Sequence, residues 1–141
     1  MKAVLFDMDY TLVDYRTGIE PLFTGIFTDV FKTLCLDIKN FDFFMTYGRH
    51  NGIKGSLEKL GIEQKPFMYE VEKKVSEVLP SEIEKGNIVL YPDVIPALES
   101  LKDSCLLGIV TNHVSKGVEI ITDSLGIKPY FQSIVSCDSS G

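Results

Sequence analysis

The stretch that decides the fold is Ala3-Val4-Leu5-Phe6-Asp7-Met8-Asp9-Tyr10-Thr11-Leu12-Val13-Asp14. It begins as a short apolar run, which is typical of a strand buried on both faces of a parallel sheet. In an extended chain, residues two apart share a face at about 7 Å, so Asp7 and Asp9 would approach one substrate group while Met8 points the other way. Because chemistry in α/β sheets gathers at the carboxyl ends of strands, this acidic pair is a candidate catalytic site.

The composition fits an ordinary cytoplasmic globular chain and leaves small phosphorylated substrates open. The chain has 141 residues, 45% of them apolar and 24% charged, and a net charge of −6. No apolar run is long enough to span a membrane, and the run from Lys2 to Asp7 is too short for a signal peptide. With no basic stripe to neutralise phosphates, we expect no nucleic-acid partner. Three distant cysteines indicate reduced thiols rather than disulfides or a zinc site: Cys35, Cys105 and Cys137.

Residues 15–84 are predicted to form an all-helical block. Apolar residues recur at helical spacing over residues 19–34, which predicts a long amphipathic helix. A second helix is expected from Asp42, and the glycines over residues 48–55 predict a loop after it. Pro66 is expected to open a further helix and Pro80 to close it. Five aromatic residues are assigned to packing within this block: Phe23, Phe27, Phe31, Phe43 and Phe44.

An alternation of helices and strands follows the helical block. We predict a helix after Tyr91-Pro92-Asp93, a strand over residues 105–110, a helix from about Ser115 to Gly126 and a strand over residues 131–136. Short helical crossovers imply a parallel sheet whose strands end at one edge, so Thr111 and Asn112 can face Asp7 and Asp9. The predicted fold class is therefore α/β, with a Rossmann-like core of about three strands over residues 1–14 and 85–141.

The chain resembles the haloacid dehalogenase superfamily of hydrolases, most of which are phosphatases. Asp7-Met8-Asp9-Tyr10-Thr11 matches the D-x-D-x-T motif of that family, and Ile109-Val110-Thr111-Asn112 matches its second motif. The helical block between them is similar in position to the helical cap of the family. Residues 136–141 look like the segment that leads into the third motif. The resemblance implies a parallel Rossmann-like sheet with residues 15–84 as an inserted cap.

The third and fourth motifs of that family, a Lys and an acidic pair that helps to hold Mg²⁺, are missing from this sequence. Lys116 could stand in for the Lys, but a surface lysine in the first turn of a helix is the simpler interpretation. We therefore expect the chain to be a truncated piece of a longer protein. Alternatively, it pairs with another chain or swaps, because a three-stranded sheet would leave an apolar edge of the first strand unpaired.

The resemblance implies a Mg²⁺-dependent phosphatase of a small phosphorylated metabolite. Asp7 would be the nucleophile that forms an aspartyl-phosphate, and Asp9 would protonate the leaving alkoxide and then activate water. Mg²⁺ would bind Asp7 and the backbone carbonyl of Asp9, while Thr111 and Asn112 would hold the phosphoryl oxygens. Since a halide leaves without a proton, an acid at position 9 favours phosphoryl transfer over dehalogenation.

Each of these assignments has a structural alternative. Asp7 and Asp9 could simply end a strand, Thr111 could cap the next turn, and Asn112 could be there for left-handed geometry. His113 could reach a substrate or be a solvated loop residue. The same choice, substrate contact or solvated turn, applies to the basic residues of the glycine-rich segment: Arg49, His50 and Lys54.

Two functional classes therefore stay open. The first is a phosphatase of the family, with a phosphomutase as a variant of it. The second is a catalytically incomplete half-domain that acts in binding or assembly. The substrate is not identified, because cap loops vary while the core chemistry stays fixed.

Overall fold

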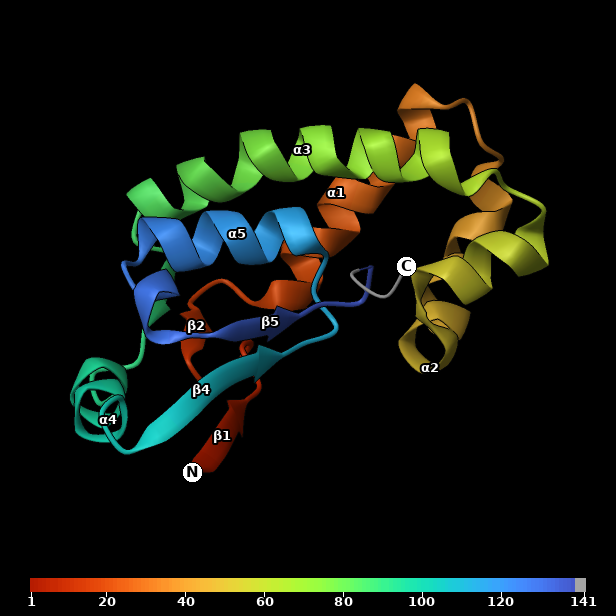
Figure 1. Cartoon of the computed structure of the whole chain (residues 1–141). Helices are drawn as coiled ribbons and strands as arrows, with labels where there is room; N and C mark the ends of the chain where they lie inside the picture. Colours follow the sequence, from red (N-terminus) through yellow and green to blue (C-terminus); the bar gives the residue numbers. More distant parts are fainter. Residues whose placement is uncertain (139–141) are drawn as a thin grey trace. The chain divides into compact units, whose positions relative to one another are not determined.

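The computed structural model describes residues 1–138, which form two compact units (Figure 1). The sheet unit comprises Met1–Gly18 and the chain from Leu79 onward, and the helical unit comprises Ile19–Val78. The boundary between the two units falls inside one long helix, α3 (Gln64–Glu84).

The sheet unit is built on three parallel strands. They are β1 (Lys2–Phe6), β4 (Cys105–Val110) and β5 (Ser133–Val135), and they lie side by side in the order β1-β4-β5 (Figure 1). Phe6 is level with Ile109 on β4, and Ile109 is level with Ile134 on β5. The predicted α/β class and parallel sheet are confirmed. The third strand is shorter than expected, since Phe131 and Ser136 lie outside it.

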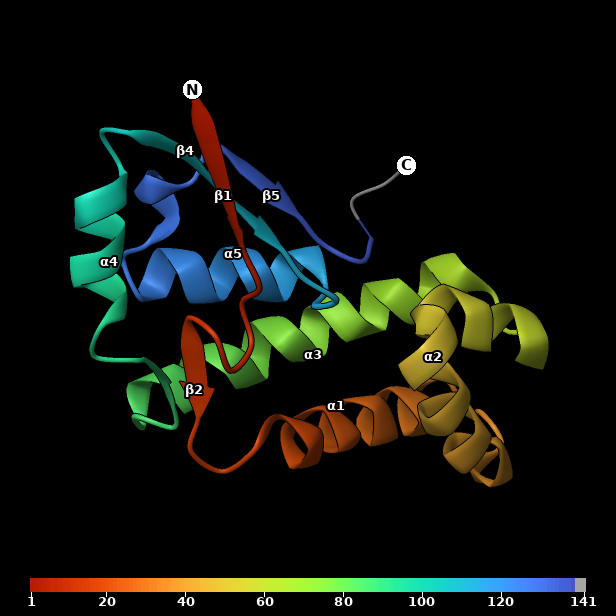
Figure 2. The same cartoon turned by 90° about the horizontal axis from the view of Figure 1, so that it is seen from below.

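Two helices connect these strands. They are α4 (Val94–Leu101) and α5 (Ser115–Ser124), which is followed by the short helix η2 (Lys128–Tyr130). In both views α5 lies alongside β4 and β5 (Figures 1 and 2). Apolar side chains from the helices and from β4 form the core of this unit: Val94, Leu98, Leu107, Ile109, Val118 and Ile121.

One face of the parallel sheet is exposed, which corrects the prediction that β1 is buried on both faces. Because side chains alternate along a strand, Leu5 shares this face with Leu106 and Val110 of β4 and with Val135 of β5. These side chains are 68%, 47%, 46% and 46% exposed, respectively. Among the described residues, β1 pairs only with β4, so its other edge is unpaired. The apolar run indicated a strand, but it could not reveal that one face lacks a cover.

A second, two-stranded sheet was not predicted. It pairs β2 (Val13–Tyr15) with β3 (Ile88–Leu90) in antiparallel orientation, and Val13 is level with Leu90. Tyr15 therefore lies on a strand, so the expectation that residues 15–84 are all helical was wrong at its first residue. Strands of three residues are too short to produce a recognisable alternation of apolar and polar side chains.

The helical unit contains α1 (Ile19–Thr33), η1 (Ile38–Asn40), α2 (Phe41–Leu60) and most of α3. Four phenylalanines meet at its centre: Phe27, Phe31, Phe44 and Phe67. The ring of Phe44 lies 5.2 to 5.3 Å from the rings of the other three, centroid to centroid. The assignment of Phe27, Phe31 and Phe44 to packing is confirmed, whereas Phe43 is 43% exposed and stacks on Tyr47.

Glycine and proline misled the sequence analysis in this unit. Residues 48–55 are not a loop but part of α2, which has non-helical geometry only at Gly52 (φ 74°). Gly48 allows close packing instead, because a Cβ there would lie 3.0 Å from the Ser56 hydroxyl oxygen. Pro80 does not end its helix but lies inside α3, which continues to Glu84.

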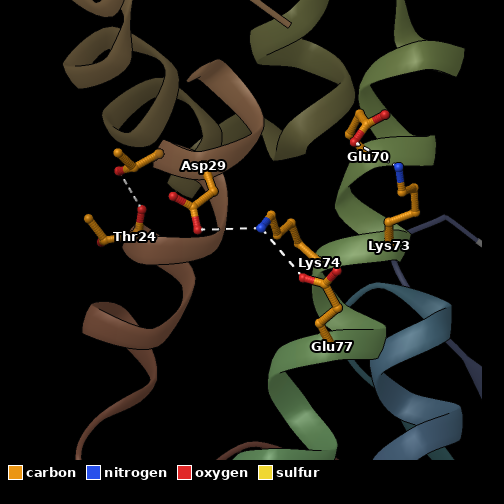
Figure 3. Close-up of polar contacts among 7 residues, drawn as sticks. Thr24, Asp29, Glu70, Lys73, Lys74 and Glu77 are labelled. Atoms are coloured by element: carbon orange, nitrogen blue, oxygen red, sulfur yellow. Dashed lines mark hydrogen bonds and ion pairs between the residues drawn. The ribbon is translucent and has the colours of Figure 1, made fainter. Parts of the chain in front are cut away.

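Charged residues join α1 to α3 on the surface of the helical unit. Figure 3 shows Lys74 of α3 between Asp29 of α1, at 3.8 Å, and Glu77 of its own helix, at 3.4 Å. Such exposed pairs contribute little, usually less than about 1 kcal/mol each. Burial of the apolar side chains around the phenylalanine cluster therefore stabilises this unit more than these ion pairs do.

Two further expectations were examined over residues 1–138. None of the helices there combines the length and the apolar character that a membrane span requires. Cys35, Cys105 and Cys137 are free thiols, as predicted.

Candidate functional site

The predicted acidic pair lies at the carboxyl end of β1. Asp7 directly follows the strand, is exposed, and accepts a hydrogen bond from the Met8 backbone N–H (2.8 Å). Met8 is fully buried, and Asp9 is half-buried. The Met8 carbonyl then accepts hydrogen bonds from the N–H groups of Leu12 (3.0 Å) and Val13 (3.1 Å), so the chain folds back tightly after the acids. The turn holds both carboxylates at the strand end.

The second predicted pair lies at the end of the neighbouring strand, β4. Because β1 and β4 are parallel and in register, the loops that contain Asp7 and Thr111 start from the same edge of the sheet. Thr111 is buried, and its hydroxyl oxygen accepts the backbone N–H of His113 at 3.2 Å. This is the local turn that the structural alternative anticipated, yet the hydroxyl proton is still available for donation. Asn112 is exposed.

Asp9 has an unusual electrostatic environment for a carboxylate. Burial raises its pKa above the ordinary value of 3.8, and the nearby charge of Asp7 acts in the same direction. His113 and a hydrogen bond from the Tyr15 hydroxyl oppose the shift but do not cancel it. A carboxyl group with a raised pKa retains its proton to higher pH, which is the property required of a general acid.

His113 is neither solvated nor open to a substrate, which corrects the expectation of a solvated loop histidine. Its side chain is buried, with Nδ1 at 3.2 Å from the Val114 carbonyl oxygen. The ring packs against Gly117, where a Cβ would lie 2.0 Å from His113 Cε1. Burial lowers the pKa of His113, while Asp9 acts to raise it. The His113 ring fits here because Gly117 has no side chain. The spacing of apolar residues in the sequence does not reveal such a contact.

The remaining candidate residues belong to helices rather than to the loops that follow these two strands. Arg49, His50 and Lys54 are exposed residues of α2 in the helical unit, and Arg49 pairs with Glu20 of α1 at 3.1 Å. Lys116 is partly exposed in the first turn of α5, with its Nζ at 4.0 Å from Glu119. The geometry of Lys116 agrees with the surface-lysine interpretation.

The chemistry of the donors at the β1 end fits magnesium better than zinc. Within residues 1–138, no three His, Cys, Asp or Glu side chains gather closely enough to hold a metal ion by themselves. Mg²⁺ does not need such a set, because it commonly binds one or two carboxylates and keeps several waters. The Asp7 carboxylate and the Asp9 backbone carbonyl are oxygen donors of the kind Mg²⁺ prefers, whereas zinc sites are usually built with nitrogen or sulfur ligands.

The sequence analysis missed two polar arrangements near the site. The first is the hydrogen bond from Tyr15 of β2 to Asp9, which was hidden because β2 was not predicted. The second joins β5 to α5, where Asp138 accepts the backbone N–H of Ser115 (2.8 Å) and its hydroxyl (2.6 Å). Within the predicted third-motif segment, residues 139–141 lie outside the described residues.

The comparison with protein families decides which family the chain belongs to. Residues 4–140 match the family described as haloacid dehalogenase-like hydrolase. The chain belongs to this family. The match covers both strand ends described above, and the resemblance to this family is confirmed. None of the curated proteins compared with the chain matches it.

Solved structures show the same fold. A haloacid dehalogenase-like hydrolase from Streptococcus pneumoniae is 26% identical, with a TM-score of 0.55, over 100% of this chain and 63% of its own. A predicted phosphoglycolate phosphatase from Haemophilus somnus is 24% identical, with a TM-score of 0.59; the match covers 99% of this chain and 64% of the phosphatase. CbbY from Rhodobacter sphaeroides, in complex with xylulose-(1,5)bisphosphate, is 21% identical, with a TM-score of 0.66. That match covers 100% of this chain and 65% of CbbY. This haloacid dehalogenase-like chain thus spans a little under two thirds of their length.

Proposed function

We propose that the chain contributes the nucleophile and the general acid of a Mg²⁺-dependent phosphatase that acts on a small phosphorylated metabolite. The observation that supports this most is the common edge of β1 and β4, where an exposed Asp7 and a half-buried Asp9 follow one strand and Thr111 the other. Membership of the haloacid dehalogenase-like hydrolases supports hydrolysis as the reaction class.

Asp7 is the nucleophile in this proposal. It is exposed, and its Oδ1 accepts the Met8 N–H, which orients the carboxylate. A carboxylate oxygen attacks phosphorus, a new O–P bond forms, and the bond to the ester oxygen breaks. Water then attacks the aspartyl-phosphate, which releases phosphate and restores the carboxylate.

Asp9 donates a proton in the first step and accepts a proton in the second. An alkoxide is a poor leaving group, so a proton must reach it as the O–P bond breaks. The raised pKa of Asp9 keeps a larger fraction of this carboxyl protonated than an exposed aspartate would. After the alcohol leaves, the Asp9 carboxylate accepts a proton from the attacking water, and the cycle closes.

The phosphoryl group needs positive or hydrogen-bonding partners, because its oxygens repel Asp7. The Thr111 hydroxyl and the Asn112 backbone N–H donate to those oxygens in this proposal. Mg²⁺, held by Asp7 and Asp9, would screen the anionic substrate from the anionic nucleophile. The helical unit would act as a cap, with Arg49, His50 and Lys54 contacting the part of the substrate away from the phosphate.

A second candidate is a catalytically incomplete half-domain that acts in binding or assembly. The exposed apolar face of the sheet, with Leu5 68% exposed, favours it, because parallel sheets are normally covered on both faces. The two candidates differ in one respect: the first predicts turnover by Asp7 and the second does not.

Hydrolysis of an activated aryl phosphate by the purified chain, with and without Mg²⁺, distinguishes them. The parent chain should release phosphate only with Mg²⁺, and Asp7→Asn should reduce turnover to background. Asp14→Asn is a matched control, because Asp14 is a neighbouring carboxylate on β2 with no role in the proposal. Absence of turnover from a well-folded parent chain would contradict the phosphatase proposal and favour the half-domain.

A further inference from the structure

The carboxylate proposed as the general acid is held by a tyrosine from a different strand. Tyr15 of β2 is buried, and its hydroxyl donates a hydrogen bond to Asp9 Oδ1. The geometry makes the Tyr15 hydroxyl the donor and one oxygen of Asp9 the acceptor.

The ring of Tyr15 is in turn held by Tyr10. The two rings meet edge to face, with centroids 5.6 Å apart and an interplanar angle of 63°. Tyr10 is also in the left-handed region (φ 59°), which is unfavourable for a residue other than glycine. A glycine would avoid that cost but would lose the ring contact. The unfavourable backbone conformation of Tyr10 therefore indicates that its ring contact with Tyr15 has a functional role.

The backbone hydrogen bonds fix the geometry of this group. The Tyr10 N–H donates to the Val13 carbonyl at 2.7 Å, and Asp9 and Val13 form an isolated bridge. β2 is held by its pairing with β3, where Tyr15 is level with Ile88. Asp9, Tyr10 and Tyr15 therefore belong to one tight turn and the strand that follows it.

We propose that Tyr15 is a positioning residue for Asp9 and that Tyr10 supports it. The Tyr15 hydroxyl fixes Oδ1, so the orientation of the carboxyl group is set and Oδ2 is the oxygen that exchanges the proton with substrate. This inference rests on the proposed function of Asp9. Steps in which Asp9 moves a proton need the hydroxyl, whereas steps that need no proton do not.

The kinetic test uses Tyr15→Phe, which removes the hydroxyl and keeps the ring. For an alkyl phosphate, whose leaving group needs a proton, we expect kcat to fall about tenfold with KM unchanged. For an activated aryl phosphate we expect less than about a twofold loss. Tyr130→Phe is the matched control, because the Tyr130 hydroxyl donates to Glu99, a different carboxylate of the sheet unit, and its removal should change neither rate. Equal losses on both esters would overturn the positioning role.

Tyr10 provides a second pair of variants. Tyr10→Gly suits the left-handed backbone but removes the ring, so it should reproduce the loss selective for alkyl phosphates. Tyr10→Phe retains the ring and should behave like the parent chain. If Tyr10→Gly has full activity on alkyl phosphates, the supporting role of Tyr10 is overturned.

A stability cycle separates failure of this inference from failure of the proposed function. Urea midpoints are measured for the parent, Tyr15→Phe, Asp9→Ala and the double variant, none of which requires turnover. We expect the double variant to shift the midpoint by less than the sum of the two single shifts. Additive shifts would overturn the Tyr15–Asp9 bond while leaving the proposed function intact. A parent chain without turnover would overturn the function and the catalytic role of Tyr15 together, whatever the cycle shows.

Discussion

Asp9 differs from Asp7 in burial, and this difference favours the different roles proposed for the two acids. Asp7 is exposed, whereas Asp9 is half-buried with a raised pKa. An exposed carboxylate suits a nucleophile, while a buried carboxyl that retains a proton suits a general acid. The division of roles that we propose for the two acids therefore follows from their different burial.

The role of Asp9 predicts a dependence on the leaving group. Asp9→Asn should slow hydrolysis of an alkyl phosphate by about 100-fold or more, because the amide cannot deliver a proton. An activated aryl phosphate should be affected much less. Rates for a series of esters of increasing leaving-group pKa, measured for the parent and the variant, test this. Parallel slopes in the two series would refute the acid role.

At this scale the sequence predicted the acids but not their partners. Asp7, Asp9 and Thr111 follow apolar runs, and strand ends can be read from such runs. Tyr15 and His113 were misjudged because their roles depend on contacts with Asp9 and Gly117, which are set by how the turn and α5 pack. Local patterns do not contain that information.

The start of α5 depends on a carboxylate far away in the sequence. Asp138 accepts the backbone N–H and the hydroxyl of Ser115, the first residue of α5. Burial alone would raise the pKa of Asp138, but these hydrogen bonds outweigh it and lower the pKa. The strand β5 and the helix α5 are joined through this cap.

Removal of the Asp138 charge should therefore destabilise the chain in a pH-dependent way. Asp138→Asn should lower the free energy of unfolding by about 1 kcal/mol at neutral pH. Because the pKa of Asp138 is lower in the folded chain than the unfolded value of 3.8, its ionised form stabilises the fold at higher pH. This stabilisation is lost as the pH falls through the folded pKa. The stability difference between the parent and Asp138→Asn should therefore shrink in acid. Urea unfolding at several pH values measures this. The control is Asp123→Asn, at an exposed ion pair of the same helix, which should cost less than about 0.5 kcal/mol. If the destabilisation by Asp138→Asn does not change with pH, the capping role of Asp138 is contradicted.

The fit of α5 over His113 makes Gly117 hard to replace. Gly117→Ala should destabilise the chain by about 1 to 3 kcal/mol, because the new methyl group would overlap the imidazole ring. Gly25→Ala in α1 is the control, since no atom lies within 4 Å of the position of its Cβ. That control should be neutral or stabilising by up to about 1 kcal/mol. Thermal unfolding compares the two, and an equal response would refute the packing argument.

The accuracy of the element predictions depended on length and on chemical context. β4 has its predicted bounds and α5 begins at its predicted first residue but ends two residues before Gly126, because an apolar run or helical period followed by a polar or glycine stop marks each element. β2 and β3 were missed because three residues do not define a period. The glycines of α2 serve close packing and a kink, and Pro80 is tolerated inside α3, so residue types that usually end helices do not do so here.

At the scale of the whole molecule, the exposed sheet face is the main unexplained feature. Leu5, Leu106, Val110 and Val135 form an apolar face next to the unpaired edge of β1. Exposed apolar faces and free strand edges promote association. We therefore propose that this chain pairs with another chain through this face and edge, which is the alternative to truncation that the sequence raised.

The association can be measured directly. Sedimentation of the chain over a roughly hundredfold concentration range should show a shift from monomer to larger species. Leu5→Lys should weaken that shift, because a charge on an edge strand opposes pairing. Ile38→Lys, at an exposed apolar residue of η1 in the helical unit, should leave it unchanged. A monomer at every concentration would contradict the pairing.

The central claim is that Asp7 forms a covalent phosphoryl intermediate. The most direct measurement is rapid acid quenching of the chain during reaction with a phosphate ester and Mg²⁺, followed by peptide mass spectrometry. We predict the mass of one phosphoryl group on the peptide that contains Asp7, and its loss in Asp7→Asn. Phosphate release without any labelled peptide, or a label on another residue that persists in Asp7→Asn, would contradict the account.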